Sequence, residues 1–182
     1  MPSRRQVAAW LALLLLQRHA SAMSAPREVH AELPNATLGG NARFTFLGIG
    51  VYDASLWVTP GFSVGDYDRH AFALTLSYLR DFSGAAIADR SVAEMRRQPG
   101  ATDAQLESWA RRMNEVFPDV RKGDRLTGIH RPGQGARFHI NGQLAGHLPD
   151  ADFSRRFFGI WLSAQTSDPR LRDALAAPGA SR

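Results

Sequence analysis

The polar residues best suited to hold a ligand lie in or beside two apolar segments. Arg43 and Tyr52 fall within segment 42–58, and Arg80 directly follows segment 71–79. A guanidinium can hold a carboxylate through two parallel hydrogen bonds, and a phenol can donate or accept one. We therefore take these three as candidate ligand-binding residues. Plainer interpretations stay open: Arg43 could be a solvent-facing strand residue, and Arg80 could pair with the acid that follows it.

Other patterns that carry chemistry are weak. The sequence holds no cysteine, which excludes disulfides, thiolate metal ligands and cysteine nucleophiles. His130 and His139 lie in neighbouring predicted strands, but a turn at 132–135 pairs residue 130 with about residue 137, so their imidazoles are offset. The pair Gly48 and Gly50 is no nucleotide-binding loop, because it lies within a predicted strand and no helix follows. We expect no catalytic residues of these kinds, no bound metal and no cofactor.

Composition favours one globular domain. The chain has 182 residues, of which 44% are hydrophobic and 9% aromatic, enough for a real core. Of the 22 basic residues only Lys122 is a lysine. The arginines are scattered beside acids or apolar faces rather than clustered with stacking aromatics, so we expect no nucleic-acid partner.

The first residues have the order of a secretory leader. Arg4 and Arg5 precede the ten-residue apolar run 7–16, and the small residues 20–22 suit a signal peptidase. A spanning helix needs ~20 apolar residues, so we expect no membrane span. Removal of the leader lowers the formal net charge from +5 to +2, and the protein would be periplasmic or secreted. The predicted division is a signal peptide at 1–22 and a domain at 23–182, with its core at about 29–177.

Segment 42–58 is the element around which the other predicted elements are arranged. It is rich in aromatic and β-branched residues but too long for an ordinary strand of ~5–6 residues. It either bends at Gly48 and Gly50 or forms two strands, because glycine permits a bulge. We interpret it as one long, kinked strand across the middle of a sheet.

The remaining elements follow from periodicity and from capping residues. Alternation predicts strands, Asn141-Gly142 predicts a hairpin turn, and Ser, Thr or Asp residues begin each predicted helix. The stripe that contains Trp109 is typical of a helix packed on a core. The order indicates an α+β domain, an antiparallel sheet with a layer of helices on one face. Predicted strands are 29–33, 71–79, 125–131, 136–140 and 143–147, and predicted helices are 83–97, 103–117, 150–162 and 168–177.

An ordered set of phrases resembles the chalcone isomerase-like proteins, most closely their secreted bacterial branch. The resemblance covers about residues 29 to 177. It implies a large antiparallel sheet, a helical layer and a ligand cleft between them. The phrases are Ile49-Gly50-Val51-Tyr52, Tyr78-Leu79-Arg80-Asp81, Phe138-His139-Ile140-Asn141-Gly142-Gln143-Leu144-Ala145-Gly146, and Asp152-Phe153 leading to Ile160-Trp161-Leu162.

The resemblance also bears on activity. The family includes isomerases that close a flavanone ring without a cofactor, and non-catalytic relatives that bind fatty acids. In the enzymes an arginine, a threonine and a tyrosine serve the reaction. Alignment of the phrases places Asn35, Leu47 and Leu79 at those positions, so the resemblance implies that the catalytic set is missing.

Three hypotheses follow. The first is a non-catalytic protein that binds a small amphipathic or aromatic ligand, such as a fatty acid, in a cleft between sheet and helices. The second is a cofactor-independent isomerase, an intramolecular lyase, in which Tyr52, Tyr78 or Arg80 takes over the missing roles. The third is an interaction protein of the cell envelope that uses the Trp109 helix as its partner surface.

Overall fold

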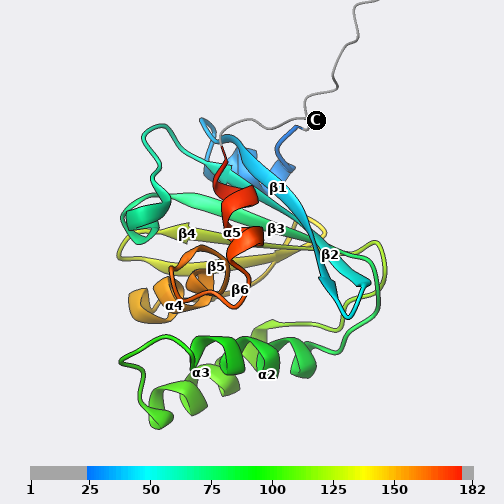
Figure 1. The fold of residues 1–182 in the computed structure, drawn as a ribbon, viewed down its shortest axis with the longest axis vertical. Helices are drawn as coiled ribbons and strands as arrows, with labels where there is room; N and C mark the ends of the chain where they lie inside the picture. The colour runs from blue at the N-terminus through cyan, green and yellow to red at the C-terminus, as the bar shows by residue number, and fades with distance from the viewer. Residues whose placement is uncertain (1–23, 178–182) are drawn as a thin grey trace, which may run out of the picture.

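A six-stranded antiparallel sheet forms the centre of the computed structural model, which describes residues 24–177 (Figure 1). Its strands lie side by side in chain order, so each strand pairs with the next one along the sequence. The predicted signal peptide at 1–22 and the tail at 178–182 lie outside the described residues. The strands are β1 (Thr37–Phe46), β2 (Ile49–Val58), β3 (Phe72–Tyr78), β4 (Arg125–Arg131), β5 (Gly135–Ile140) and β6 (Gln143–Leu148).

Four helices cover one face of this sheet, as the α+β prediction requires. Their apolar stripes and the sheet residues beneath them form the main core, which includes Phe72, Phe138 and Phe158. None of the helices within residues 24–177 has the length and apolar character needed to span a membrane. The four are α2 (Gly84–Met95), α3 (Asp103–Val116), α4 (Ala151–Leu162) and α5 (Pro169–Ala176), and a short 3-10 helix, η1 (Val64–Arg69), links β2 to β3.

The helices begin where their capping residues predict. Ser83 accepts from the amide of the third helical residue of α2 at 3.1 Å, and Thr102 forms a capping box with Gln105 at the start of α3. Asp150 and Asp168 cap α4 and α5 in the same way. Each cap satisfies an amide that the helix itself leaves unpaired, which fixes where the helix starts.

The prediction of one long strand over 42–58 is wrong. The chain reverses at Leu47-Gly48, and Phe46 pairs with Ile49 across the turn, so segment 37–58 is a two-stranded hairpin. Both turn residues have positive φ, 50° at Leu47 and 77° at Gly48. The hairpin consequently lies at the edge of the sheet, with β1 as the edge strand, rather than across its middle.

The prediction of a strand at 29–33 is also wrong. Residues Arg27–Glu32 form the short helix α1, which packs on the sheet face opposite the four longer helices. Val29 and Leu33 bury one side of it against Trp57 and Ile129. Glu28, also buried, accepts hydrogen bonds from Arg125 and Thr127, so α1 is fixed to β4 by polar as well as apolar contacts.

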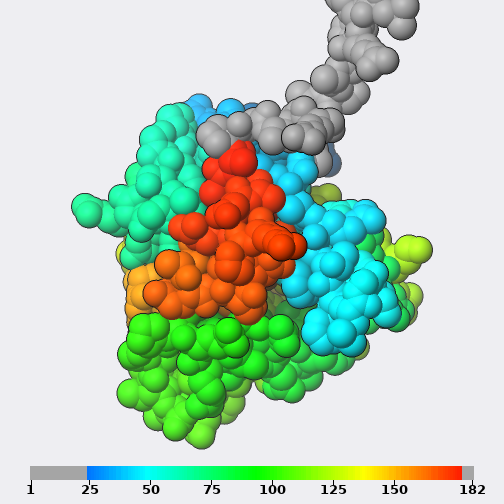
Figure 2. Space-filling view, viewed as in Figure 1, coloured from blue at the N-terminus to red at the C-terminus, as the bar shows by residue number. Residues whose placement is uncertain are grey.

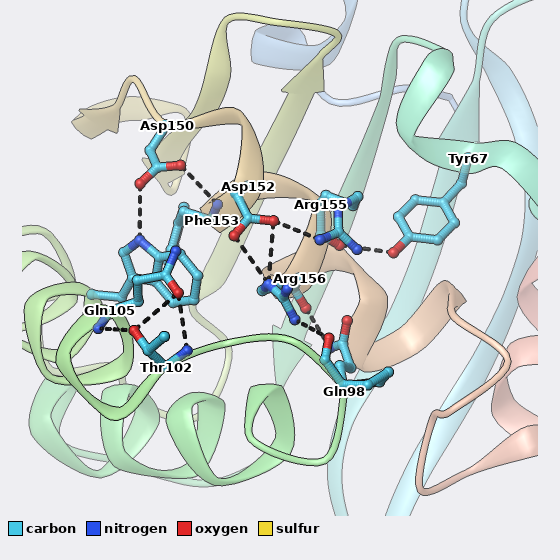
Figure 3. Close-up of polar contacts among 11 residues, drawn as sticks. Tyr67, Gln98, Thr102, Gln105, Asp150, Asp152, Phe153, Arg155 and Arg156 are labelled. Carbon is cyan, nitrogen blue, oxygen red and sulfur yellow. Dashed lines mark hydrogen bonds and ion pairs between the residues drawn. The ribbon is translucent and has the colours of Figure 1, made fainter.

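A polar network fixes the start of α4 against its neighbours, as Figure 3 shows. Asp150 accepts a hydrogen bond from the indole of Trp109 in α3 at 2.9 Å. The buried Arg156 donates to the carbonyl of Pro99 at 2.9 Å, and its own carbonyl accepts from Gln98 at 2.7 Å. Tyr67 of η1 donates to the carbonyl of Arg155 at 2.8 Å. Three separate segments thus hold one helix in a fixed position over the sheet.

Candidate functional site

A cavity of about 270 Å³ lies between the sheet and the helical layer. Its volume is near the lower end of the ~300–1,000 Å³ typical of small-molecule sites. The walls come from β1 to β4, from α2, α4 and α5, and from the 163–168 connection. Most of the lining is apolar or aromatic, and the side chains that matter most below are Phe44, Leu76, Tyr78, Leu126, Phe157 and Trp161.

Tyr52 supplies a polar group inside this apolar space. Its hydroxyl accepts a hydrogen bond from Trp161 Nε1 at 3.0 Å, and its ring stacks on Phe44 with centroids 5.1 Å apart. Burial raises the pKa of Tyr52 far above its ordinary value, and burial likewise raises the pKa of Tyr78. Both phenols are therefore neutral at physiological pH. Because the Tyr52 oxygen already accepts from Trp161, its own proton is the part that a bound molecule can receive.

The cavity reaches the surface beside Arg90 of α2. The Arg90 side chain lines the cavity and is 60% exposed, whereas its ion-pair partner Glu94 is 10% exposed. Arg90 Nη2 lies 2.7 Å from Glu94 Oε1, and Arg97 lies 3.8 Å from the other carboxylate oxygen. This pair holds the guanidinium at the cavity mouth, with N–H groups left over for a second acceptor.

The α4–α5 connection forms the other side of the mouth. Thr166 donates to the carbonyl of Ile160 at 2.7 Å, and its hydroxyl accepts from the amide of Asp168 at 3.2 Å. Asp168 in turn caps α5. Thr166 and Asp168 are thus engaged with the backbone, and among the residues the structure describes Arg90 is the cation that lines the cavity.

Only one of the three predicted ligand-binding residues lines the cavity. Tyr52 lines it. Arg43 lies outside, where its guanidinium donates to both carboxylate oxygens of Asp53 at 2.7 and 2.9 Å on the exposed side of the hairpin. Arg80 is exposed beyond the end of β3 and does not line the cavity. Their plainer interpretations, as surface residues, fit these positions.

The positions that the family resemblance assigns to catalysis also lie outside the cavity. Asn35 is exposed before β1, Leu47 is 85% exposed at the hairpin turn, and Leu79 follows β3 without lining the cavity. Tyr78, one residue earlier, does line it.

Arg90 was missed because its sequence context is that of an ordinary surface helix. A usable signal does exist: Ile87, Ser91 and Glu94 follow one another at spacings of four and three, so they share a helix face with Arg90. That face buries polar groups, since Ser91 and Glu94 are 7% and 9% exposed. Polar residues on the core side of a helix indicate a cavity or a polar partner.

Two other residue groups carry no site. Among residues 24–177, no cluster of three or more histidine, aspartate or glutamate side chains could hold a metal ion. Segment 61–65 matches the Gly-x-Ser-x-Gly pattern of hydrolases, but it spans the loop after β2 and the first residues of η1 rather than a strand-to-helix turn. Ser63 bonds to Asp66, and Asp66 rather than Ser63 approaches His70, at 3.3 Å. A nucleophilic serine needs the imidazole itself as its neighbour.

Comparison with known proteins establishes the family. The profile described as chalcone isomerase-like matches residues 18–176, most of the chain. The chain belongs to the chalcone isomerase-like family. An uncharacterized protein of Haemophilus influenzae is 30% identical over 138 residues, which cover 75% of this chain and 65% of that protein. The chain therefore spans slightly less than two thirds of this relative's length.

The fold agrees with the family. The crystal structure of an Arabidopsis thaliana fatty-acid binding protein superposes with a TM-score of 0.58 at 13% sequence identity, covering 78% of this chain and 87% of that one. At this identity the likeness concerns the fold alone. It confirms the prediction of an antiparallel sheet with helices.

Proposed function

We propose that this chalcone isomerase-like protein binds one small amphipathic molecule, such as a fatty acid, without transforming it. The observation that carries the proposal is the cavity itself, a mostly apolar chamber lined by one cation, Arg90, and by two carboxylates, Glu94 and Asp168, that are engaged by Arg90 and by the α5 amide. Apolar walls with a few placed polar groups are the usual design of a small-molecule site. The structural relative from Arabidopsis thaliana is a fatty-acid binding protein, which supports the same ligand class.

The geometry favours one orientation of the ligand. A carboxylate at the mouth would receive hydrogen bonds from Arg90, and its tail would lie against Leu76, Leu126 and Phe157. The reverse orientation would bury a charge in an apolar interior, which costs several kcal/mol. Arg90 thus takes the role that the sequence assigned to Arg43 and Arg80.

We further propose that the protein acts in the periplasm or is secreted. The support is the order of basic, apolar and small residues within 1–22, and the resemblance to the secreted bacterial branch of the family. A compartment beside a membrane would suit a carrier of amphipathic molecules.

Calorimetric titration with dodecanoate tests the binding proposal. Wild-type protein should bind one dodecanoate, and Arg90→Ala should weaken binding about tenfold, because a hydrogen bond to a charged group contributes about 1.5–3 kcal/mol. Dodecanol, which lacks the carboxylate, should bind both proteins equally. Arg111→Ala is the matched control, since Arg111 is exposed on α3 and does not line the cavity. Absence of dodecanoate binding to the wild type would contradict the proposal.

A second function, an isomerase with a rearranged site, is favoured by one observation. The phenols of Tyr52 and Tyr78 line the cavity with rings 6.1 Å apart, and Arg90 lies at its mouth. Neutral phenols can stabilise a developing oxyanion. Incubation with a chalcone, followed by the loss of its visible absorbance, separates the two functions. We expect the spontaneous rate of ring closure; a faster rate that Tyr78→Phe abolishes would establish the isomerase instead.

A further inference from the structure

The tip of the β1–β2 hairpin exposes three large apolar side chains, and we call Phe46, Leu47 and Ile49 the apolar tip. Their exposed fractions are 56%, 85% and 51%. Within residues 24–177 only one other large hydrophobic residue, Leu144, is comparably exposed. Single exposed apolar residues are ordinary, but three in one turn indicate an interaction site.

The apolar tip projects beyond the rest of the sheet. In β2 the ladder with β3 begins at Tyr52, whereas the last pairs of the hairpin, Phe46 with Ile49 and Thr45 with Gly50, have no third strand beside them. Figure 2 shows this hairpin in cyan as a lobe at the edge of the molecule, next to the orange α4–α5 segment. The tip is therefore free of a neighbouring strand and open to an interaction partner.

Leu47 is a costly choice for its position. Its φ of 50° lies in the left-handed region, which disfavours side chains other than glycine, asparagine and aspartate by about 1–2 kcal/mol. The equivalent turn of the β5–β6 hairpin uses Asn141-Gly142, with φ of 50° and 87°, the pair that this geometry prefers. A fully exposed leucine in a strained turn contributes nothing visible to folding, so it points to a role outside the fold.

The hairpin that carries the apolar tip also lines the cavity. Phe44, two residues before Phe46, lines the cavity and stacks on Tyr52. Val51, two residues after Ile49, also lines it, and the β1–β2 ladder shifts register between these residues and the tip. The tip and the cavity are therefore neighbours along one hairpin.

Basic residues lie on one side of the tip, at the end of β3 and in the loop that precedes β4. Leu79 lies against the hairpin at Gly50, and exposed Arg80 follows it. Exposed Arg121 and Lys122 lie in the next loop, whose backbone bonds to the end of β3. The acids there, Asp81 and Asp124, accept hydrogen bonds from the backbone amides of Lys122 and Arg121. Cations beside an apolar projection are complementary to the anionic head groups of a lipid bilayer.

We propose that the apolar tip inserts into the surface of a lipid bilayer and places the cavity mouth at the membrane, so that a ligand enters the cavity from the lipid. The ligand transfer rests on the proposed function; the docking does not. A bilayer is the occupant that matches the chemistry, because a convex, projecting apolar turn flanked by arginine and lysine fits an acyl boundary beneath phosphate groups.

Flotation with vesicles of phosphatidylcholine and phosphatidylglycerol, about three to one, tests the docking. Wild-type protein should float with the vesicles, and Leu47→Glu should lower its partition coefficient by about tenfold or more, since the variant replaces a buried apolar side chain by a charged one. Leu144→Glu is the matched control, because Leu144 is 63% exposed but lies on β6 at the far edge of the sheet. This variant should bind vesicles like the wild type.

Insertion of the tip into the bilayer is measured by the fluorescence of a second variant. A Leu47→Trp substitution should show a blue-shifted emission with vesicles, and brominated lipids should quench it. The docking is overturned if the wild type does not float or if Leu47→Glu floats equally well. Either result would be expected if the tip binds a protein partner instead. Dodecanoate titration without vesicles tests the proposed function separately from the docking. Leu47→Glu should bind dodecanoate as the wild type does. If the wild type binds no dodecanoate, the proposed ligand-binding function is refuted but the docking is not.

Discussion

At the scale of single residues, the cavity depends on an aromatic pair that no local pattern reveals. Trp161 and Tyr52 are 109 positions apart, yet one hydrogen bond joins them inside the apolar wall. The bond satisfies the indole N–H, which would otherwise be buried without an acceptor at a cost of about 1–3 kcal/mol. It also orients the phenol toward the chamber. Tyr52 could be selected from the sequence as a polar residue in an apolar strand, but its partner could not, because pairing across the fold leaves no trace in spacing.

His130 shows how a titratable group can serve the core. It is 2% exposed and lies between Phe72 and Phe158. One ring nitrogen lies 2.7 Å from Ser154 Oγ and the other 3.0 Å from the carbonyl oxygen of Asp68. Burial lowers the pKa of His130, although the Asp68 carbonyl favours the protonated form. The imidazole is therefore neutral, donates to the carbonyl, and accepts from the serine.

This burial predicts a pH dependence of stability. The unfolded chain takes up a proton on His130 near pH 6.5, whereas the folded protein does so only at lower pH, so stability is lost as pH falls from about 6.5 through the lowered pKa. His130→Gln should flatten this part of the profile, measured by urea unfolding between about pH 7.5 and pH 5. An unchanged slope in the variant would contradict the assignment.

At the scale of elements, most boundaries could be predicted and two could not. Caps and alternation locate α2 to α5 and β3 to β6, because those signals act within a few residues. The β1–β2 turn does not follow from the sequence because Leu47 is not a turn-forming residue, and Gly48 and Gly50, which come after it, are equally compatible with a kink in one strand. Leu47 makes the turn unrecognisable in the sequence, and the membrane proposal gives a reason for an exposed leucine at this position.

The helix α1 was missed for a different reason. Val29, Ala31 and Leu33 alternate as in a strand, but Val29 and Leu33 are also four positions apart, which is one face of a helix. Such a short run is ambiguous by periodicity alone. The helix is favoured by Glu28, whose carboxylate accepts a hydrogen bond from Arg125 when it lies in the first turn of α1. These two residues are 97 positions apart, so local periodicity does not reveal the contact.

The Trp109 helix illustrates the reverse case. Its stripe was predicted to be core, with a partner surface kept as an alternative. Trp109 is 2% exposed and donates to Asp150, so its side chain belongs to the core. Three of the four large exposed apolar side chains of the described residues lie at the hairpin turn, which sequence patterns do not mark as a surface.

The contact of α5 with β1 gives a prediction about glycine. A Cβ added to Gly40 would lie 2.3 Å from the carbonyl oxygen of Ala174 and 2.5 Å from that of Leu175. Gly40→Ala should therefore push α5 away from β1 and lower the free energy of unfolding by about 2 kcal/mol or more. Gly65→Ala is the control, since its added Cβ would meet only Ser63 Oγ at 3.7 Å. Urea unfolding of both variants measures the difference, and equal stabilities would contradict the close packing.

At the scale of the whole molecule, the fold class and the existence of a chamber could be predicted, but its polar lining could not. The α+β arrangement follows from the order of elements, and the family resemblance implies a cleft between the layers. Which cation faces that cleft depends on the rotation and depth of α2, and these are set by packing between distant segments. Arg43 and Arg80 were reasonable candidates on chemistry alone, and geometry favours Arg90.

The chamber is closed by the two ends of the folded chain. Phe44 comes from the first strand and Leu171 from the last helix, and both line it. Residues 127 positions apart thus meet in one wall, and the chamber exists only when the first strand and the last helix of the described residues are both in place. A ligand must therefore enter a completed fold rather than a partly folded chain.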